Sequence, residues 1–326
     1  MDEKEKRIMN NQLERLCCDF IEYRDILKNR KVFASYSQLY PLCAYICMIR
    51  HQEPNEEILR LCREILHDYA GIFSMFRGNG EEVMLTLLSC ETDPGACMDL
   101  MDRAYSTLRE EFGASHYLPV LAYYMATSIA PSEFDNFTYE TRDLFDRFNS
   151  QHPFLTSDED TLFIGLLNAS GRDHRLIVRE AEEIYQMIVE DFHWHKNPVH
   201  TLSHALTLCE GQAPAKAARF RNLFRELREE DYKYGKDYEI VPLGILANIG
   251  VDPEQIIADF IEVDNFLINS EGYGVFGFGR KTRYMHAVLV LSVYYYNGAP
   301  ELTAALIVSV LMEIAAQQAA AAAAAA

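Results

Sequence analysis

The stretch DTLFIGLLNASGRDHRLIVREAEEIYQMIVEDF, residues 160–192, contains the unit from which the fold can be predicted. Residues 160–170 are apolar almost all round, as expected for a helix enclosed by neighbours. After a short link at Gly171, residues 174–192 carry apolar side chains every three to four positions, with acidic and polar ones between them. This period is typical of a helix with one face on a core. The stretch therefore predicts a hairpin made of a buried helix and an amphipathic helix.

The same unit recurs along the chain with a mean spacing of 41 residues. A proline or, once, a glycine marks each turn: Pro54, Pro94, Pro131, Gly171, Pro214, Pro253 and Pro300. Proline suits the first position of a helix because it has no N–H to lose and its φ is already helical. Several of the apolar segments before these marks carry a small central residue, such as Gly165 or Gly244, which lets helices approach closely. A two-helix repeat of this length is typical of HEAT-like arrays.

We therefore predict an all-α protein, an array of about seven helical hairpins. No unit can bury its own apolar face, so the units must stack. The array either stays open as an α-solenoid or closes into an α/α toroid, and we favour the open form because no segment indicates a joint between the first and last units. We expect an N-terminal capping helix in residues 1–34, a single repeat domain in 35–313 and an alanine-rich helix end in 314–326.

Charge and composition exclude several classes of protein. The chain has 326 residues, of which 49% are hydrophobic and 24% charged, the ordinary globular range. It carries 30 Lys and Arg against 49 Asp and Glu, a net charge of -19. Nucleic-acid binding depends on Lys and Arg replacing counterions, and anionic membranes attract the same residues, so we expect neither partner.

The cysteines and the apolar runs indicate a cytoplasmic location. The N-terminus has no apolar core of signal-peptide length, and none of the eight cysteines forms a CxxC pair, so we expect reduced cysteines in a cytoplasm. The apolar run 302–312 has 11 residues before Glu313 interrupts it. A membrane-spanning helix needs about 20. We therefore expect a buried terminal helix and no membrane span.

Three strings carry a resemblance to a known family. They are HPFLTSDED (152–160), LSHAL (202–206) and GYGVFGFGRKTRYMHA (272–287). Together they resemble the bacterial family known as domain of unknown function 4003, from about Phe33 to the alanine-rich end. The resemblance implies a cytosolic bacterial protein of this length. It implies no catalytic residue, because the family has no established activity.

A histidine cluster is the first candidate site. His193, His195, His200 and His204 fall within twelve residues, and the last two lie at i and i+4 on one helix face, a usual spacing for two metal ligands. A third ligand from the preceding loop, with Glu190 or Asp191 as a carboxylate, would make a hydrolytic zinc or iron site with an open position. The alternative is that His204 is a core histidine and the loop histidines are exposed.

A glycine-rich segment is the second candidate site. Gly277, Gly279, Arg280, Lys281 and Arg283 stand at the expected start of a helix, where backbone N–H groups and the three cations would bind a phosphate or another anion. No strand precedes the segment, and it lacks the GK[ST] ending of a phosphate-binding loop. The alternative is a connector that lets its aromatic residues fold onto the last unit.

The third candidate is the acidic run 156–160. Paired carboxylates can act as acid and base in glycoside hydrolysis. However, Thr156 followed by Glu159 has the spacing of a capping box, which we favour.

No grouping in the sequence predicts a catalytic residue. The leading hypothesis is a non-enzymatic helical-repeat protein that binds a protein or peptide on its concave face. The alternative is a metal-dependent hydrolase, or a binder of a phosphate or nucleotide ligand, that uses His193–His204 or Gly272–Arg283.

Overall fold

The computed structural model describes residues 9–29, 39–69, 74–76, 80–273, 277–296 and 299–325. Over these ranges the chain forms 15 α-helices, a few short 3-10 turns and no strand, which confirms the all-α prediction.

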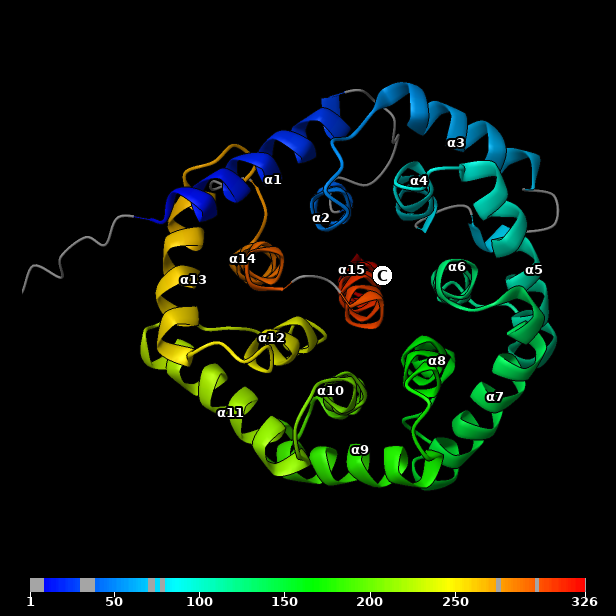
Figure 1. Cartoon of the computed structure of the whole chain (residues 1–326). Coiled ribbons are helices and arrows are strands. Elements are labelled where there is room, and N and C mark those ends of the chain that lie inside the picture. Colours follow the sequence, from blue (N-terminus) through cyan, green and yellow to red (C-terminus); the bar gives the residue numbers. More distant parts are fainter. Residues whose placement is uncertain are drawn as a thin grey trace, which may run out of the picture.

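The first fourteen α-helices form two concentric layers (Figure 1). The odd-numbered helices make the outer layer: α1 (Asn11–Asn29), α3 (Glu56–Asp68), α5 (Pro94–Phe112), α7 (Phe134–Gln151), α9 (His174–Val189), α11 (Ala213–Glu229) and α13 (Pro253–Ile268). The even-numbered helices make the inner layer: α2 (Tyr40–Ile49), α4 (Glu81–Ser89), α6 (Leu118–Ser128), α8 (Thr161–Ala169), α10 (Lys196–Leu208), α12 (Ile240–Ala247) and α14 (Arg280–Tyr295). The last helix, α15 (Pro300–Ala325), runs through the middle of the ring.

The sequence pattern explains which helix occupies which layer. The outer helix α9 buries one stripe that includes Ile177, Ile184 and Ile188, whereas every residue of the inner helix α12 is buried. Four outer helices begin at a side chain that accepts a hydrogen bond from a first-turn N–H, namely Asn55, Asp93, Asp173 and Asp252. Such a cap stabilises a helix by about 1 kcal/mol.

The expected turn residues stand between the helices. Pro94 and Pro253 are the first residues of α5 and α13. Gly171, between α8 and α9, has φ +65°, a left-handed conformation that glycine adopts without steric cost.

The first and last hairpins contact one another, so the helices form a closed ring. Helix α1 packs against α2, α13 and α14, and α14 packs against α2. The ring of Phe20 lies 6.0 Å from that of His286, and the guanidinium of Arg24 lies 5.4 Å from the ring centre of Tyr273. This arrangement differs from the open α-solenoid that we favoured. The repeat pattern predicts that the helix after Pro300 is the outer partner of α14. In the structure α1, expected as a terminal cap, lies in that place instead (Figure 1).

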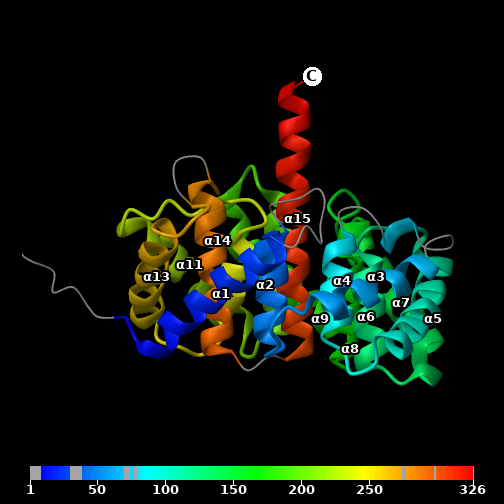
Figure 2. The same ribbon diagram turned by 90° about the horizontal axis from the view of Figure 1, so that it is seen from above.

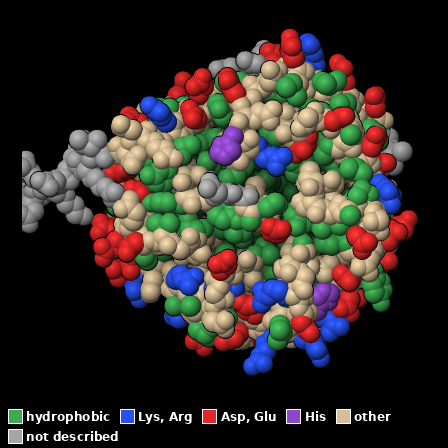
Figure 3. Space-filling view, viewed as in Figure 1, with side chains coloured by type: hydrophobic (Ala, Val, Ile, Leu, Met, Phe, Trp, Pro, Cys, Tyr) green, Lys and Arg blue, Asp and Glu red, His purple; other side chains and the backbone are tan. Residues whose placement is uncertain are grey.

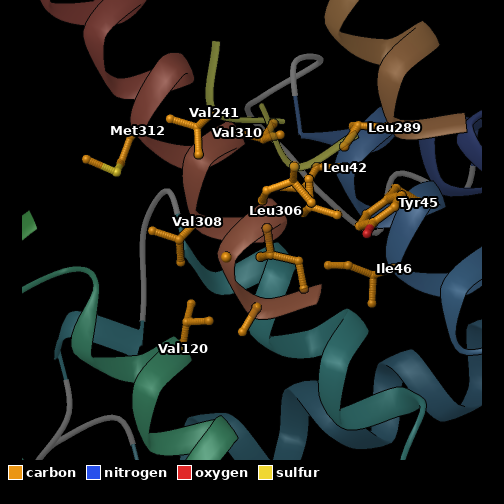
Figure 4. Packing of buried hydrophobic residues seen from close by; sticks show 14 of the residues in the cluster. Leu42, Tyr45, Ile46, Val120, Val241, Leu289, Leu306, Val308, Val310 and Met312 are labelled. Carbon is orange, nitrogen blue, oxygen red and sulfur yellow. The ribbon is translucent and has the colours of Figure 1, made fainter. Parts of the chain in front are cut away.

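Helix α15 lies in the middle because it is apolar on every side. Its residues Leu306, Val308, Val310 and Met312 are buried (Figure 4) and face residues of the surrounding layer, including Leu42, Ile46, Val120 and Leu289. It packs mainly against α2, α6, α8, α10 and α12. Its C-terminal end extends beyond one end of the ring (Figure 2). By length and composition Pro300–Gln317 is apolar enough to cross a membrane, but 56% of this window is buried, as in a core helix.

Candidate metal centre

Two of the four predicted histidine ligands lie together in the interior. His200 and His204 follow one another on the same face of α10, and their ring centres are 4.4 Å apart. Their exposed fractions are 2% and 0%. The structure places the other two elsewhere: His195 Nδ1 lies 2.8 Å from Asp237 Oδ1, and His193 is exposed. The pair predicted from the i, i+4 spacing is thus formed without its loop neighbours.

A carboxylate from the preceding repeat faces the histidine pair. Asp160 is buried, and its Oδ1 lies 3.6 Å from Nδ1 of His200 and 3.4 Å from Nδ1 of His204. Each residue offers a ligand atom, and these atoms all lie within 4.8 Å of one another. We call Asp160, His200 and His204 the triad. It is the one such group of metal-ligating side chains found among the described residues.

The turn before α8 holds the triad carboxylate in place. Ser157 caps the short 3-10 turn Asp158–Asp160, and its backbone N–H donates to Asp160 Oδ2 at 2.9 Å. The capping box is therefore Ser157 with Asp160, one residue later than the expected Thr156 with Glu159. Ser157 takes the cap because its backbone is extended, with φ -139° and ψ -178°. Since Oδ2 is occupied by the cap, Oδ1 is the oxygen that faces the histidines.

The imidazole nitrogens of the triad have no hydrogen-bond partner among the described residues. This holds for Nδ1 and Nε2 of both His200 and His204. Buried polar atoms are normally paired with protein or water, and each unpaired one costs about 1–3 kcal/mol. The described residues therefore leave the hydrogen-bonding capacity of these two buried imidazoles unused.

The electrostatics of the triad favour the metal-binding forms of its side chains. Burial, with a smaller contribution from His200, lowers the pKa of His204 to about 4, so this imidazole is neutral at pH 7. Burial opposes ionisation of Asp160, but the facing imidazoles hold its pKa below the ordinary value. A neutral imidazole and an ionised carboxylate are the forms that bind metal ions.

Aromatic side chains separate the triad from a surface groove. Phe148 lies 4.5 Å from the ring of His204, and His152 and Tyr185 lie 5.3 and 5.9 Å from the ring of His200. His152 and Tyr185 also line a groove of about 640 Å³. His152 Nε2 is 2.5 Å from Glu182 Oε2. Of the two triad histidines, His200 is therefore the one that contacts side chains of the groove wall.

The family comparison agrees with the resemblance seen in the sequence. The family model described as Protein of unknown function (DUF4003) matches residues 22–319. The chain belongs to the DUF4003 family. No curated protein and no solved structure matches the chain.

In this DUF4003 protein the cations of the glycine-rich segment are separated from one another. Arg283 is buried and donates from Nε and Nη2 to Asp264 at 2.6 and 3.1 Å. Lys281 Nζ lies 4.0 Å from Glu239 Oε1, and Arg280 is exposed at the start of α14. Arg283, one of the three cations of the predicted anion site, is thus already bound to the carboxylate of Asp264. Residues 274–276 of the segment lie outside the described part of the chain.

The glycines of this segment serve a tight turn. A Cβ on Gly277 would lie 1.9 Å from the carbonyl oxygen of Gly272, and the N–H of Phe278 donates to the same oxygen at 2.8 Å. Tyr273 belongs to the same turn, and its hydroxyl is 2.8 Å from His286 Nδ1. These contacts support the connector interpretation, while the anion site stays a prediction.

Sequence reasoning missed Asp160 as a partner of the histidines. From the sequence alone the acidic run 156–160 suggests glycoside hydrolysis or helix capping, and not metal binding. A signal was present, since Asp160 and His200 are 40 residues apart, which is one repeat. Equivalent positions of successive repeats lie side by side, so this spacing indicates that the starts of α8 and α10 are neighbours.

Proposed function

We propose that this protein binds a divalent transition metal through Asp160, His200 and His204. The observation that carries the proposal is a buried pair of imidazoles whose four nitrogens have no hydrogen bond among the described residues and whose two Nδ1 atoms lie 3.6 and 3.4 Å from Asp160 Oδ1. Burying these nitrogens without a partner costs free energy. A single metal ion would be a partner for one nitrogen of each histidine and for the Asp160 oxygen at the same time.

The chemistry of the ligands selects the kind of metal. Two imidazoles and one carboxylate suit Zn²⁺ and Fe²⁺, whereas Mg²⁺ and Ca²⁺ prefer oxygen ligands alone. Three protein ligands leave at least one position for water or a substrate, as in catalytic rather than structural zinc sites. This supports the metal-dependent alternative from the sequence. Because His152 and Tyr185 stand between the triad and the groove, a substrate from the groove would reach the metal only when these side chains move aside.

Partner binding on the concave face has less support. That hypothesis requires an accessible inner face, and α15 packs against five of the seven inner helices. A partner would therefore have to bind the outer layer or one end of the ring. The cytoplasmic location remains part of the proposal, supported by the eight cysteines, which are all free.

Metal analysis of the purified full-length chain tests the proposal. We expect about one zinc or iron per chain, and reconstitution with Zn²⁺ after chelation, in the wild-type protein. His204→Gln should lower the Zn²⁺ affinity measured by calorimetry about 100-fold or more, because it removes a ligand and keeps a polar side chain. His193→Ala is the matched control, since this exposed histidine comes from the same stretch and lies outside the triad.

Two results would contradict the proposal. A wild-type protein that binds neither Zn²⁺ nor Fe²⁺ in a saturable way would identify the triad as an internal polar cluster of the core. Loss of affinity in His193→Ala together with wild-type affinity in His204→Gln would place the metal in the surface groove instead, because His193 lines that groove and His204 does not.

A further inference from the structure

A cavity lies between the start of α15 and the inner layer, away from the triad. Its volume is about 240 Å³, and its walls come from α2, α4, α6, α14 and α15. It shares no residue with the triad or with the groove next to it. Figure 3, which views the ring from the end at which α15 begins, shows hydrophobic side chains around a hollow near the centre of this face.

The position of α15 in the ring accounts for the cavity. Helix α15 packs mainly against α2, α6, α8, α10 and α12, whereas α4 and α14 approach it less closely. The cavity opens on this looser side, next to Pro300 and Ala304. Protein interiors have few voids larger than a water molecule, so a space of this size along the axis of the ring is a specific feature of the fold.

The walls of the cavity are mostly apolar. Aliphatic side chains from five helices line it, including Ile46, Leu87, Val120, Val293 and Ile307. An apolar cavity of about 150 Å³ lined by such residues binds benzene. A cavity of 240 Å³ therefore suits a molecule of about the size of a fused pair of aromatic rings.

Three of the polar side chains that line the cavity, those of Arg50, Tyr123 and Tyr124, are paired with carboxylates of the protein. Arg50 Nη2 lies 2.5 Å from Glu91 Oε1, which also accepts from the hydroxyl of Tyr123. The hydroxyl of Tyr124 donates to Glu301 at 2.8 Å. A carboxylate ligand would have to compete with Glu91 for Arg50 and would lie near Glu301. The edge therefore favours an uncharged ligand over an anion.

We propose that this cavity is a binding site for a small, neutral, predominantly apolar molecule of about two fused rings. The observations that carry the proposal are the volume, the aliphatic walls and the pairing of Arg50, Tyr123 and Tyr124 with the carboxylates of Glu91 and Glu301. The site is independent of the proposed metal centre, so either one can fail without the other.

Calorimetric titration of the full-length protein with 1-naphthol tests the proposal. We expect saturable binding at about one site per chain, and 2-naphthoate, which has the same ring size and a negative charge, should bind at least about tenfold more weakly. Ala304→Phe places a ring in the cavity and should weaken 1-naphthol binding about tenfold or more. Val293→Phe does the same from α14 and serves if Ala304→Phe does not fold.

Two control variants separate the cavity from other causes of binding. Ala215→Phe makes the same change on the exposed face of α11 and should leave the affinity within about twofold of wild type. His204→Gln should also bind 1-naphthol normally, because the triad is elsewhere. The proposal is overturned if wild type shows no saturable binding, if the cavity variants bind as tightly as Ala215→Phe, or if 2-naphthoate binds more tightly than 1-naphthol.

Discussion

Asp160 Oδ1 lies 3.4 Å from His204 Nδ1, and both side chains are buried although they belong to different repeats. Asp160 ends the turn before α8, and His204 lies in the middle of α10. The other oxygen of Asp160 accepts the N–H of Ser157. The same carboxylate thus caps the turn before α8 with one oxygen and faces two imidazoles of the next repeat with the other.

Asp160→Asn should abolish stabilisation of the protein by metal. A ligand at 100 times its Kd stabilises the folded state by about 2.7 kcal/mol, which raises the melting temperature of a chain of this size by several degrees. We expect a chelator to lower the melting temperature of metal-loaded wild type by that amount and to leave Asp160→Asn unchanged. The amide can still accept from Ser157, so the cap survives. An equal response of the two proteins to the chelator would exclude Asp160 as a ligand.

His286 should destabilise the protein as the pH falls. Burial, and to a lesser degree Arg24, lowers its pKa to about 3, whereas a histidine in the unfolded chain has its ordinary pKa of 6.5. Between these values the unfolded chain binds more protons, so the free energy of unfolding falls as the pH is lowered from 6.5, at up to about 1.4 kcal/mol per pH unit. His286→Gln does not titrate, so urea unfolding at pH 7 and pH 5 should differ less in this variant. An unchanged pH slope would show that other groups govern the acid side.

Glu239 should make the protein less stable as the pH rises, the opposite of the effect of His286. Burial, followed by the negative charge of Glu313, raises its pKa from 4.5 to about 8. The folded state then holds a proton that the unfolded chain loses, so the free energy of unfolding falls as the pH rises from 4.5 to 8, at up to about 1.4 kcal/mol per unit. Glu239→Gln should flatten the profile most clearly between pH 6.5 and pH 8, where the His286 contribution no longer changes, and should leave the profile below pH 4.5 unchanged. A variant that keeps the wild-type slope would assign that slope to another residue.

Sequence periodicity predicts the parts of this fold that depend on residues close together in the sequence. The apolar stripe of α9 and the turn at Gly171 follow from 3.6-residue spacing and from glycine's access to positive φ. Ring closure depends instead on contacts such as Phe20 with His286, between residues at opposite ends of the sequence. No local pattern encodes that contact. In the candidate site, i, i+4 spacing predicts His200 with His204. Asp160 joins them through the packing of α8 next to α10, for which the one-repeat separation of Asp160 and His200 is the sequence signal.

Arg283 and Arg280 should differ sharply in their effect on stability. Arg283 pairs with Asp264 through two hydrogen bonds in the interior, and removing one partner of such a pair leaves a buried charge, at a cost of about 3–5 kcal/mol. Arg280 is exposed, and its loss should change the free energy of unfolding by less than about 0.5 kcal/mol. Urea unfolding of Arg283→Ala and Arg280→Ala measures both. Similar values for the two variants would contradict the pairing of Arg283 with Asp264.

Gly244 should be required for the close approach of α12 to α10. A Cβ at this position would lie 2.3 Å from Cδ1 of Leu202, a fully buried residue that has little freedom to move. Gly244→Ala gains helix propensity of about 1 kcal/mol, but overpacking of a dense core costs about 1–3 kcal/mol, so we expect net destabilisation. Gly80→Ala is the control, because a Cβ there meets nothing within 4 Å. If urea unfolding shows Gly244→Ala to be as stable as Gly80→Ala, the inner layer can widen at this point, and the small central residues of the repeats do not set the spacing of the ring.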